Sequence, residues 1–131
     1  MPQSSVVKAA AWLEIIVGAI FVTAPEVPCR LLFAVPPSGV GVPLGRFAGV
    51  ALLALGTACM PLTTAGSRRS AVLGLLIFNA GAVIFLAAVA LTTTFRGFLL
   101  WPAVILHGAI AVALLPQFLT VRSERRRLFQ A

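Results

Sequence analysis

Apolar side chains fill four long segments of this chain, and short polar segments separate them. Each apolar segment is close to the ~20 residues that an α-helix needs to cross ~30 Å of hydrocarbon. None alternates between polar and apolar residues, as a strand of a membrane barrel would. The pattern therefore predicts four membrane-spanning helices, at residues 6–24, 44–62, 71–91 and 98–119.

The connections between these segments predict how the helices are arranged. Residues 63–70 and 92–97 form short connections, which favour antiparallel neighbours. The longer connection 25–43 is rich in proline, and its apolar middle predicts a short interfacial helix or a re-entrant turn. The basic tail 120–131 is expected to lie along the membrane surface. The predicted architecture is all-α, a single membrane domain that forms an antiparallel four-helix bundle.

The composition indicates the same class of protein. Of the 131 residues, 60% are hydrophobic and 10% are charged, whereas a soluble domain is about half apolar and about a quarter charged. A small soluble domain has too much surface to cover with so few charges. Disorder requires low hydrophobicity and high charge. The composition therefore excludes both classes and leaves an integral membrane protein with the lipid bilayer as its surroundings.

The positive charges indicate an orientation. The formal net charge is +7, but the basic residues lie at the ends of apolar segments, which argues against nucleic-acid binding. The side that holds both termini carries Lys8, Arg68, Arg69, Arg122, Arg125, Arg126 and Arg127, and the other side carries Arg30, Arg46 and Arg96. The positive-inside rule predicts that both termini are cytoplasmic.

Three polar side chains interrupt the predicted spans. Glu14 and Asn79 each lie ~12 Å from the cytoplasmic end of a span, and His107 lies ~14 Å from the outer end of another. Polar groups inside a membrane are costly, so they form a candidate polar centre that could bind a quinone headgroup, a small polar substrate or a cation. The alternative interpretation is that they are hydrogen-bonding groups that only hold helices together. Arg46, near the outer face, is a candidate ligand or lipid contact.

Other sequence features bear on partners and chemistry. Gly45, Gly49 and Gly56 form a small-residue face that predicts close contact with a protein partner or a second copy of the chain. No hydrolase, zinc-protease or phosphate-loop motif is present, and one histidine is too few for a zinc site. Cys29 lies in the outer connection and Cys59 near the cytoplasmic end of a span, so no disulfide between them is expected.

Two segments resemble known families. AWLEIIVGAIFVTAPE and PLGRFAGVALLALGTACM resemble the DoxX-like group of small four-helix bacterial inner-membrane proteins. The resemblance implies a place in the inner membrane beside redox or quinone chemistry, and it extends to Glu14, Arg46 and Gly49. The chain is also similar in size to small multidrug-resistance transporters, which have an essential acidic residue in the first helix. Glu14 fits that pattern, whereas His107 and the long first connection depart from it.

Three functions follow as hypotheses. The first is an accessory subunit of a larger redox-linked membrane complex, or a homo-oligomer. The second is a quinone- or small-substrate-binding enzyme built around Glu14, Asn79 and His107. The third is a proton-coupled transporter that uses Glu14. The sequence assigns no catalytic residue, and a quinone is the one cofactor that it suggests.

Overall fold

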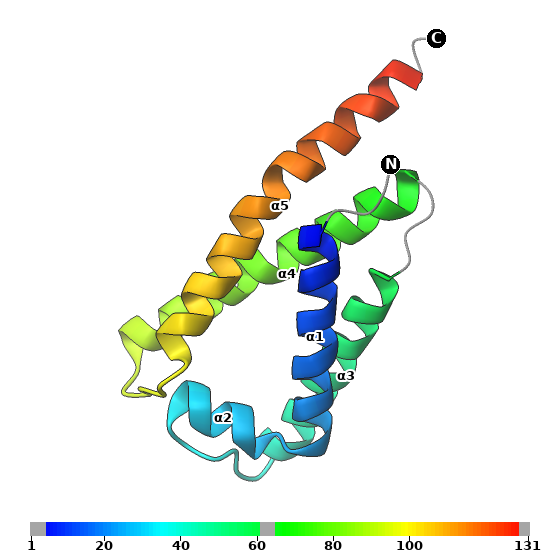
Figure 1. Ribbon diagram of the computed structural model, residues 1–131. Helices are drawn as coiled ribbons and strands as arrows, with labels where there is room; N and C mark the ends of the chain where they lie inside the picture. The colour runs from blue at the N-terminus through cyan, green and yellow to red at the C-terminus, as the bar shows by residue number, and fades with distance from the viewer. Residues whose placement is uncertain (1–4, 61–64, 129–131) are drawn as a thin grey trace.

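The computed structural model describes residues 5–60 and 65–128, and this part of the chain folds into helices joined by short connections (Figure 1). The helices are α1 (Ser5–Thr23), α2 (Glu26–Phe33), α3 (Gly41–Ala58), α4 (Ala65–Thr92) and α5 (Leu100–Leu128). Four of them contain segments long and apolar enough to cross a membrane, namely Ser5–Thr23, Gly41–Ala58, Ser67–Thr92 and Leu100–Leu119. The prediction of an all-α fold is therefore confirmed for the described residues, and each of the four predicted spans coincides with a helix long and apolar enough to cross a membrane.

The helix bounds differ from the predicted spans at several ends. α3 ends at Ala58, short of the predicted residue 62, although residues 61–64 lie outside the described part. α4 begins before residue 71, and α5 continues beyond residue 119 through most of the basic tail. The reason is that hydropathy marks the length that fits in hydrocarbon, whereas a helix continues as long as its backbone hydrogen bonds do.

The apolar middle of the first connection forms the short helix α2. It ends where Ala34 adopts a left-handed conformation with φ 61° and donates its N–H to the Arg30 carbonyl at 2.9 Å. Two prolines follow at positions 36 and 37 and prevent the helix from continuing. α2 turns the chain between α1 and α3, at the lower end of the molecule in Figure 1.

Glycines bring α1 and α3 into close contact. A Cβ at Gly49 would lie 2.7 Å from the Gly18 carbonyl oxygen, and one at Gly56 would lie 2.7 Å from the Ala11 carbonyl oxygen. Gly45 lies against Pro25, just after α1. These contacts run in opposite order along the two helices. The small-residue face of α3 is therefore covered by α1 of the same chain, and these glycines do not form an open surface for a partner.

α4 and α5 form the second pair. Leu86 and Ala90 of α4 pack with Leu100 of α5 near the connection between the two helices. Further along, the Arg69 guanidinium lies 5.7 Å from the centre of the Phe118 ring. These contacts also run in opposite order, as expected for helices joined by a short connection.

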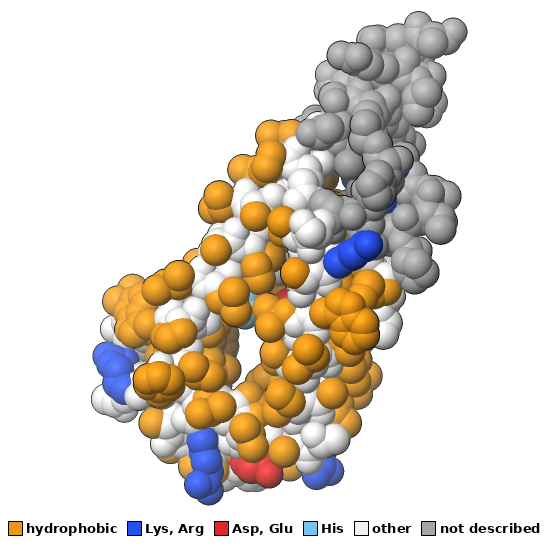
Figure 2. Space-filling view, in the orientation of Figure 1, with side chains coloured by type: hydrophobic (Ala, Val, Ile, Leu, Met, Phe, Trp, Pro, Cys, Tyr) orange, Lys and Arg blue, Asp and Glu red, His pale blue; other side chains and the backbone are white. Residues whose placement is uncertain are grey.

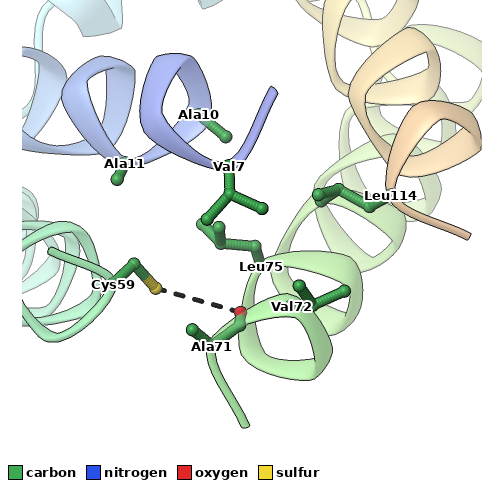
Figure 3. Close-up of a cluster of buried hydrophobic side chains, with 8 residues drawn as sticks. All are labelled: Val7, Ala10, Ala11, Cys59, Ala71, Val72, Leu75 and Leu114. Carbon is green, nitrogen blue, oxygen red and sulfur yellow. Dashed lines mark hydrogen bonds between the residues drawn. The ribbon is translucent and has the colours of Figure 1, made fainter. Parts of the chain in front are cut away.

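The two pairs meet in one buried cluster, which Figure 3 shows. Side chains from α1, α4 and α5 point toward one another and toward Cys59, which follows α3. The members are Val7, Ala10, Ala11, Cys59, Ala71, Val72, Leu75 and Leu114. Small side chains on α1 allow the four spanning helices to converge here. We call this group the apical cluster.

Cysteines and basic side chains mark the two ends of the molecule. Cys29 lies in α2 and Cys59 lies beyond the opposite end of α3, and no disulfide joins these two residues. Arg30 and Arg96 lie at the end that contains α2, whereas Lys8 lies in the first turn of α1 near the apical cluster. In Figure 2, basic side chains accordingly occur at both ends and the surface between them is mostly hydrophobic.

Candidate functional site

Asn79 and His107 are joined by a hydrogen bond between α4 and α5. The Asn79 Nδ2 donates to the Leu75 carbonyl, one turn earlier in α4, at 2.8 Å. The Asn79 Oδ1 then faces the His107 ring, 2.8 Å from Nδ1. Since this oxygen can only accept, Nδ1 carries the proton, and Nε2 of the neutral ring is left as an acceptor.

The surroundings of this pair hold the imidazole in place. Asn79 is fully buried, and both ends of its amide have partners. Phe78 meets the His107 ring edge-on, with ring centres 5.8 Å apart and an interplanar angle of 79°. His107 itself is half-buried. α4 therefore fixes the imidazole by a hydrogen bond on one side and an aromatic contact on another.

Glu14 is the second fully enclosed polar side chain in the described part of the chain, beside Asn79. Only 1% of it is exposed, and its Oε1 has no hydrogen-bond partner among the described residues. A buried carboxyl oxygen without a partner carries an uncompensated desolvation penalty. Such a group in a membrane helix marks a place where a proton, an ion or a ligand can be bound.

The apical cluster places Glu14 at the level of the other two residues. Glu14 lies one turn beyond Ala10, and Asn79 lies one turn beyond Leu75. His107 lies two turns before Leu114, on a helix that runs the other way. All three therefore lie just below the apical cluster, on the side toward α2. The structure joins Asn79 directly to His107 and shows no direct bond from Glu14 to either. We call these three residues the polar centre.

The structure places Arg46 away from the polar centre. It is exposed near the start of α3, one turn before Gly49, which contacts α1 beyond Glu14. Sequence reasoning did not single out Phe78 or the partner of the glycine face, Gly18. Phe78 precedes Asn79, but its contact with His107 depends on how α4 and α5 pack.

Among the described residues, no three His, Cys, Asp or Glu side chains lie together in a way that could hold a metal ion. The polar centre instead offers one carboxyl group, one imidazole acceptor and one amide that is already engaged. These are groups that hydrogen-bond an uncharged polar headgroup or exchange a proton with it.

Comparison with models of known protein families, with curated proteins and with solved structures found no match for this chain. The resemblance to DoxX-like proteins therefore stays a prediction, and the function is argued from the site.

Proposed function

We propose that this chain is a small multi-pass membrane protein whose polar centre binds the headgroup of a lipid-soluble molecule, with quinones as the class that fits its chemistry. The observation that carries the proposal is the buried, unpartnered Glu14 oxygen at the level of the oriented His107 ring. Both groups can change protonation state, and the apolar surroundings shield them from water.

The chemistry of a quinone headgroup suits these two side chains. A quinone carbonyl accepts a hydrogen bond, which a protonated Glu14 can donate. The hydroxyl of the reduced form donates a hydrogen bond, which Nε2 of His107 can accept. Asn79 acts as a positioning residue, because it directs the proton of the imidazole to Nδ1.

A purely structural role explains only part of the polar centre. The Asn79–His107 bond joins two helices and would serve that purpose alone. Glu14 joins nothing through its Oε1, yet a carboxyl group costs about 2.5–3.5 kcal/mol in a membrane helix. A buried carboxyl group whose insertion cost is not offset by a hydrogen bond to another described residue fits a binding role better than a packing role.

The wider proposal places the protein in the bacterial inner membrane, as an antiparallel four-helix bundle with cytoplasmic termini. A role as an accessory subunit or homo-oligomer is a second possibility, but Gly45, Gly49 and Gly56 do not support it because α1 covers them. Purification from native membranes tests it, since a stoichiometric partner is its required outcome. A transporter that uses Glu14 requires proton-coupled flux in vesicles, which Glu14→Gln would abolish.

Quinone titration of the protein in lipid nanodiscs tests the proposal directly. Quenching of the fluorescence of Trp12 and Trp101 reports binding of a short-chain quinone. We expect Glu14→Leu and His107→Phe each to weaken binding by about tenfold, because each replacement removes one hydrogen bond to a strongly polar group.

The control is Thr57→Val. This hydroxyl also lies in a spanning helix, but it is exposed and bonds only to carbonyls of its own helix. The control should bind like the unmodified protein. Equal affinity for all variants, with normal accumulation in the membrane, would contradict a quinone site at the polar centre.

A further inference from the structure

An opening separates the two helix pairs on the α2 side of the polar centre. Figure 2 shows it between the α1–α3 pair and the α4–α5 pair, and Figure 1 shows that α2 lies below it. α1 and α3 make few contacts with α4 and α5, compared with the contacts inside each pair. The opening therefore faces the bilayer sideways.

The apical cluster closes the opening at its upper end. Leu75 and Leu114 are fully buried there, and Ala11 is fully buried beside them. The polar centre lies immediately below this layer. A molecule coming from the water at this end would have to pass through closely packed apolar side chains to reach Glu14.

The lower end is closed by a strap between α2 and the connection that precedes α5. The Gly97 N–H donates to the Leu32 carbonyl at 3.1 Å, and the Leu99 N–H donates to the Leu31 carbonyl at 2.8 Å. These bonds satisfy carbonyls at the C-terminal end of α2. A Cβ at Gly97 would overlap the backbone of Leu31 and Leu32, so the contact requires a glycine.

The segments that run from the polar centre to the strap are apolar. Residues 15–22 of α1, 80–91 of α4 and 100–106 of α5 contain no charged, amide or hydroxyl side chain. The stretch of α4 from Asn79 to Leu86 alone is ~10 Å long. An apolar space of this kind does not hold ordered water, because water there would lack polar partners.

We propose that this opening holds the hydrocarbon tail of the ligand whose headgroup binds the polar centre, so that the ligand is a single-chain amphiphile that enters sideways from the bilayer. The inference rests on the proposed function for the headgroup, and it adds the class of the ligand and its route. A small water-soluble substrate has no comparable route, because both ends of the opening are closed.

Photocrosslinking in nanodiscs tests the position of the tail. The first probe is a quinone with a ten-carbon chain that carries a diazirine, and the second has the same chain on a methyl ester. Mass spectrometry then locates the labelled residues. We expect the quinone probe to label Val17, which lies on the Glu14 face of α1 one turn further on, in preference to the lipid-exposed Ile16.

A matched pair of variants gives the second measurement. Val17→Phe enlarges a half-buried side chain on the Glu14 face of α1, where the proposal places the tail, whereas Ile16→Phe adds the same ring on the exposed face of α1. Val17→Phe should weaken binding of the tailed quinone by about tenfold, the equivalent of two methylenes left unburied, and leave a tail-less quinone unaffected. Ile16→Phe should leave both affinities unchanged.

The outcomes separate the two proposals. If the tail-less quinone binds but the chain labels only exposed positions such as Ile16, the tail inference is overturned while the headgroup site stands. If Glu14→Leu leaves binding of both quinones unchanged but both probes label Val17, the headgroup proposal fails while the tail site is supported. Labelling of exposed positions alone by both probes, together with equal affinities of the Phe variants, would reject the tail site.

Discussion

At the scale of single residues, the key feature is the way Asn79 governs His107. The amide nitrogen donates to a carbonyl of its own helix, and the amide oxygen accepts from His107 of the neighbouring helix. Swapping the two amide atoms by a flip would break both hydrogen bonds. This arrangement gives His107 one tautomer and leaves Nε2 available. Glu14 differs, because its buried Oε1 has no hydrogen-bond partner among the described residues.

Replacement of Asn79 by leucine should separate its effects on stability and on the imidazole. The variant keeps the branched shape of the side chain but leaves the Nδ1–H of His107 without its acceptor, which should lower the free energy of unfolding by about 1–3 kcal/mol. Denaturation in mixed micelles measures this loss, and Thr57→Val is the control. Nitrogen NMR of the imidazole should show a Nδ1–H tautomer only in the unmodified protein. A mixed tautomer before mutation would contradict the assignment.

At the scale of elements, the α1–α3 contact depends on glycines, which have no side chain to keep the two helices apart. Gly18 and Gly49 face each other so closely that any Cβ would meet backbone atoms of the other helix. Backbone atoms cannot rotate away as a flexible side chain can. The close approach also explains why α3 presents its large residues, such as Phe47 and Val50, to the lipid side.

Alanine at two glycines should have opposite effects. Gly49→Ala places a methyl group 2.7 Å from the Gly18 carbonyl oxygen, and forcing the helices apart should cost about 1–3 kcal/mol of unfolding free energy. Gly81→Ala meets nothing within 4 Å and should stabilise α4 by about 0.5–1 kcal/mol. Thermal unfolding in detergent measures both. Equal melting temperatures for the two variants would show that the α1–α3 contact is not close.

At the scale of the whole molecule, the chain consists of two helix pairs connected at their ends. The apical cluster and the α2 strap hold the pairs, and the polar centre lies between these two connections. This arrangement gives a site that has the polar centre at one end and an apolar opening along the rest of its length. It also places the start of α1, the start of α4 and the end of α5 toward one end of the molecule (Figure 1).

Reporter fusions test the orientation of this arrangement in the membrane. Fusions after Ser70 and at the C-terminus should both report the cytoplasm, whereas a fusion within residues 36–42 should report the outer side, because basic residues favour the cytoplasmic face. Substitution of Arg68 and Arg69 by glutamine should weaken this bias, and the same change at Arg30 should not. An outer location for the C-terminus would contradict the predicted number of spans or the charge rule.

The sequence by itself determined the class of fold and the residues worth testing. Hydrocarbon length and the cost of polar groups in lipid are local properties, so they revealed four spans and drew attention to Glu14, Asn79 and His107. Helix ends were less predictable, since α5 continues past residue 119 on backbone hydrogen bonds that hydropathy does not detect.

Only the tertiary structure decided which residues meet. Sequence placed Asn79 and His107 at a similar depth, but their hydrogen bond depends on how α4 rotates against α5. Likewise, the pattern of small residues around Gly49 predicts a close contact without naming the partner, and packing assigned it to α1 of the same chain. The physical reason is that helix pairing in lipid depends on shape, whereas hydrophobicity is nearly the same on every face of these helices.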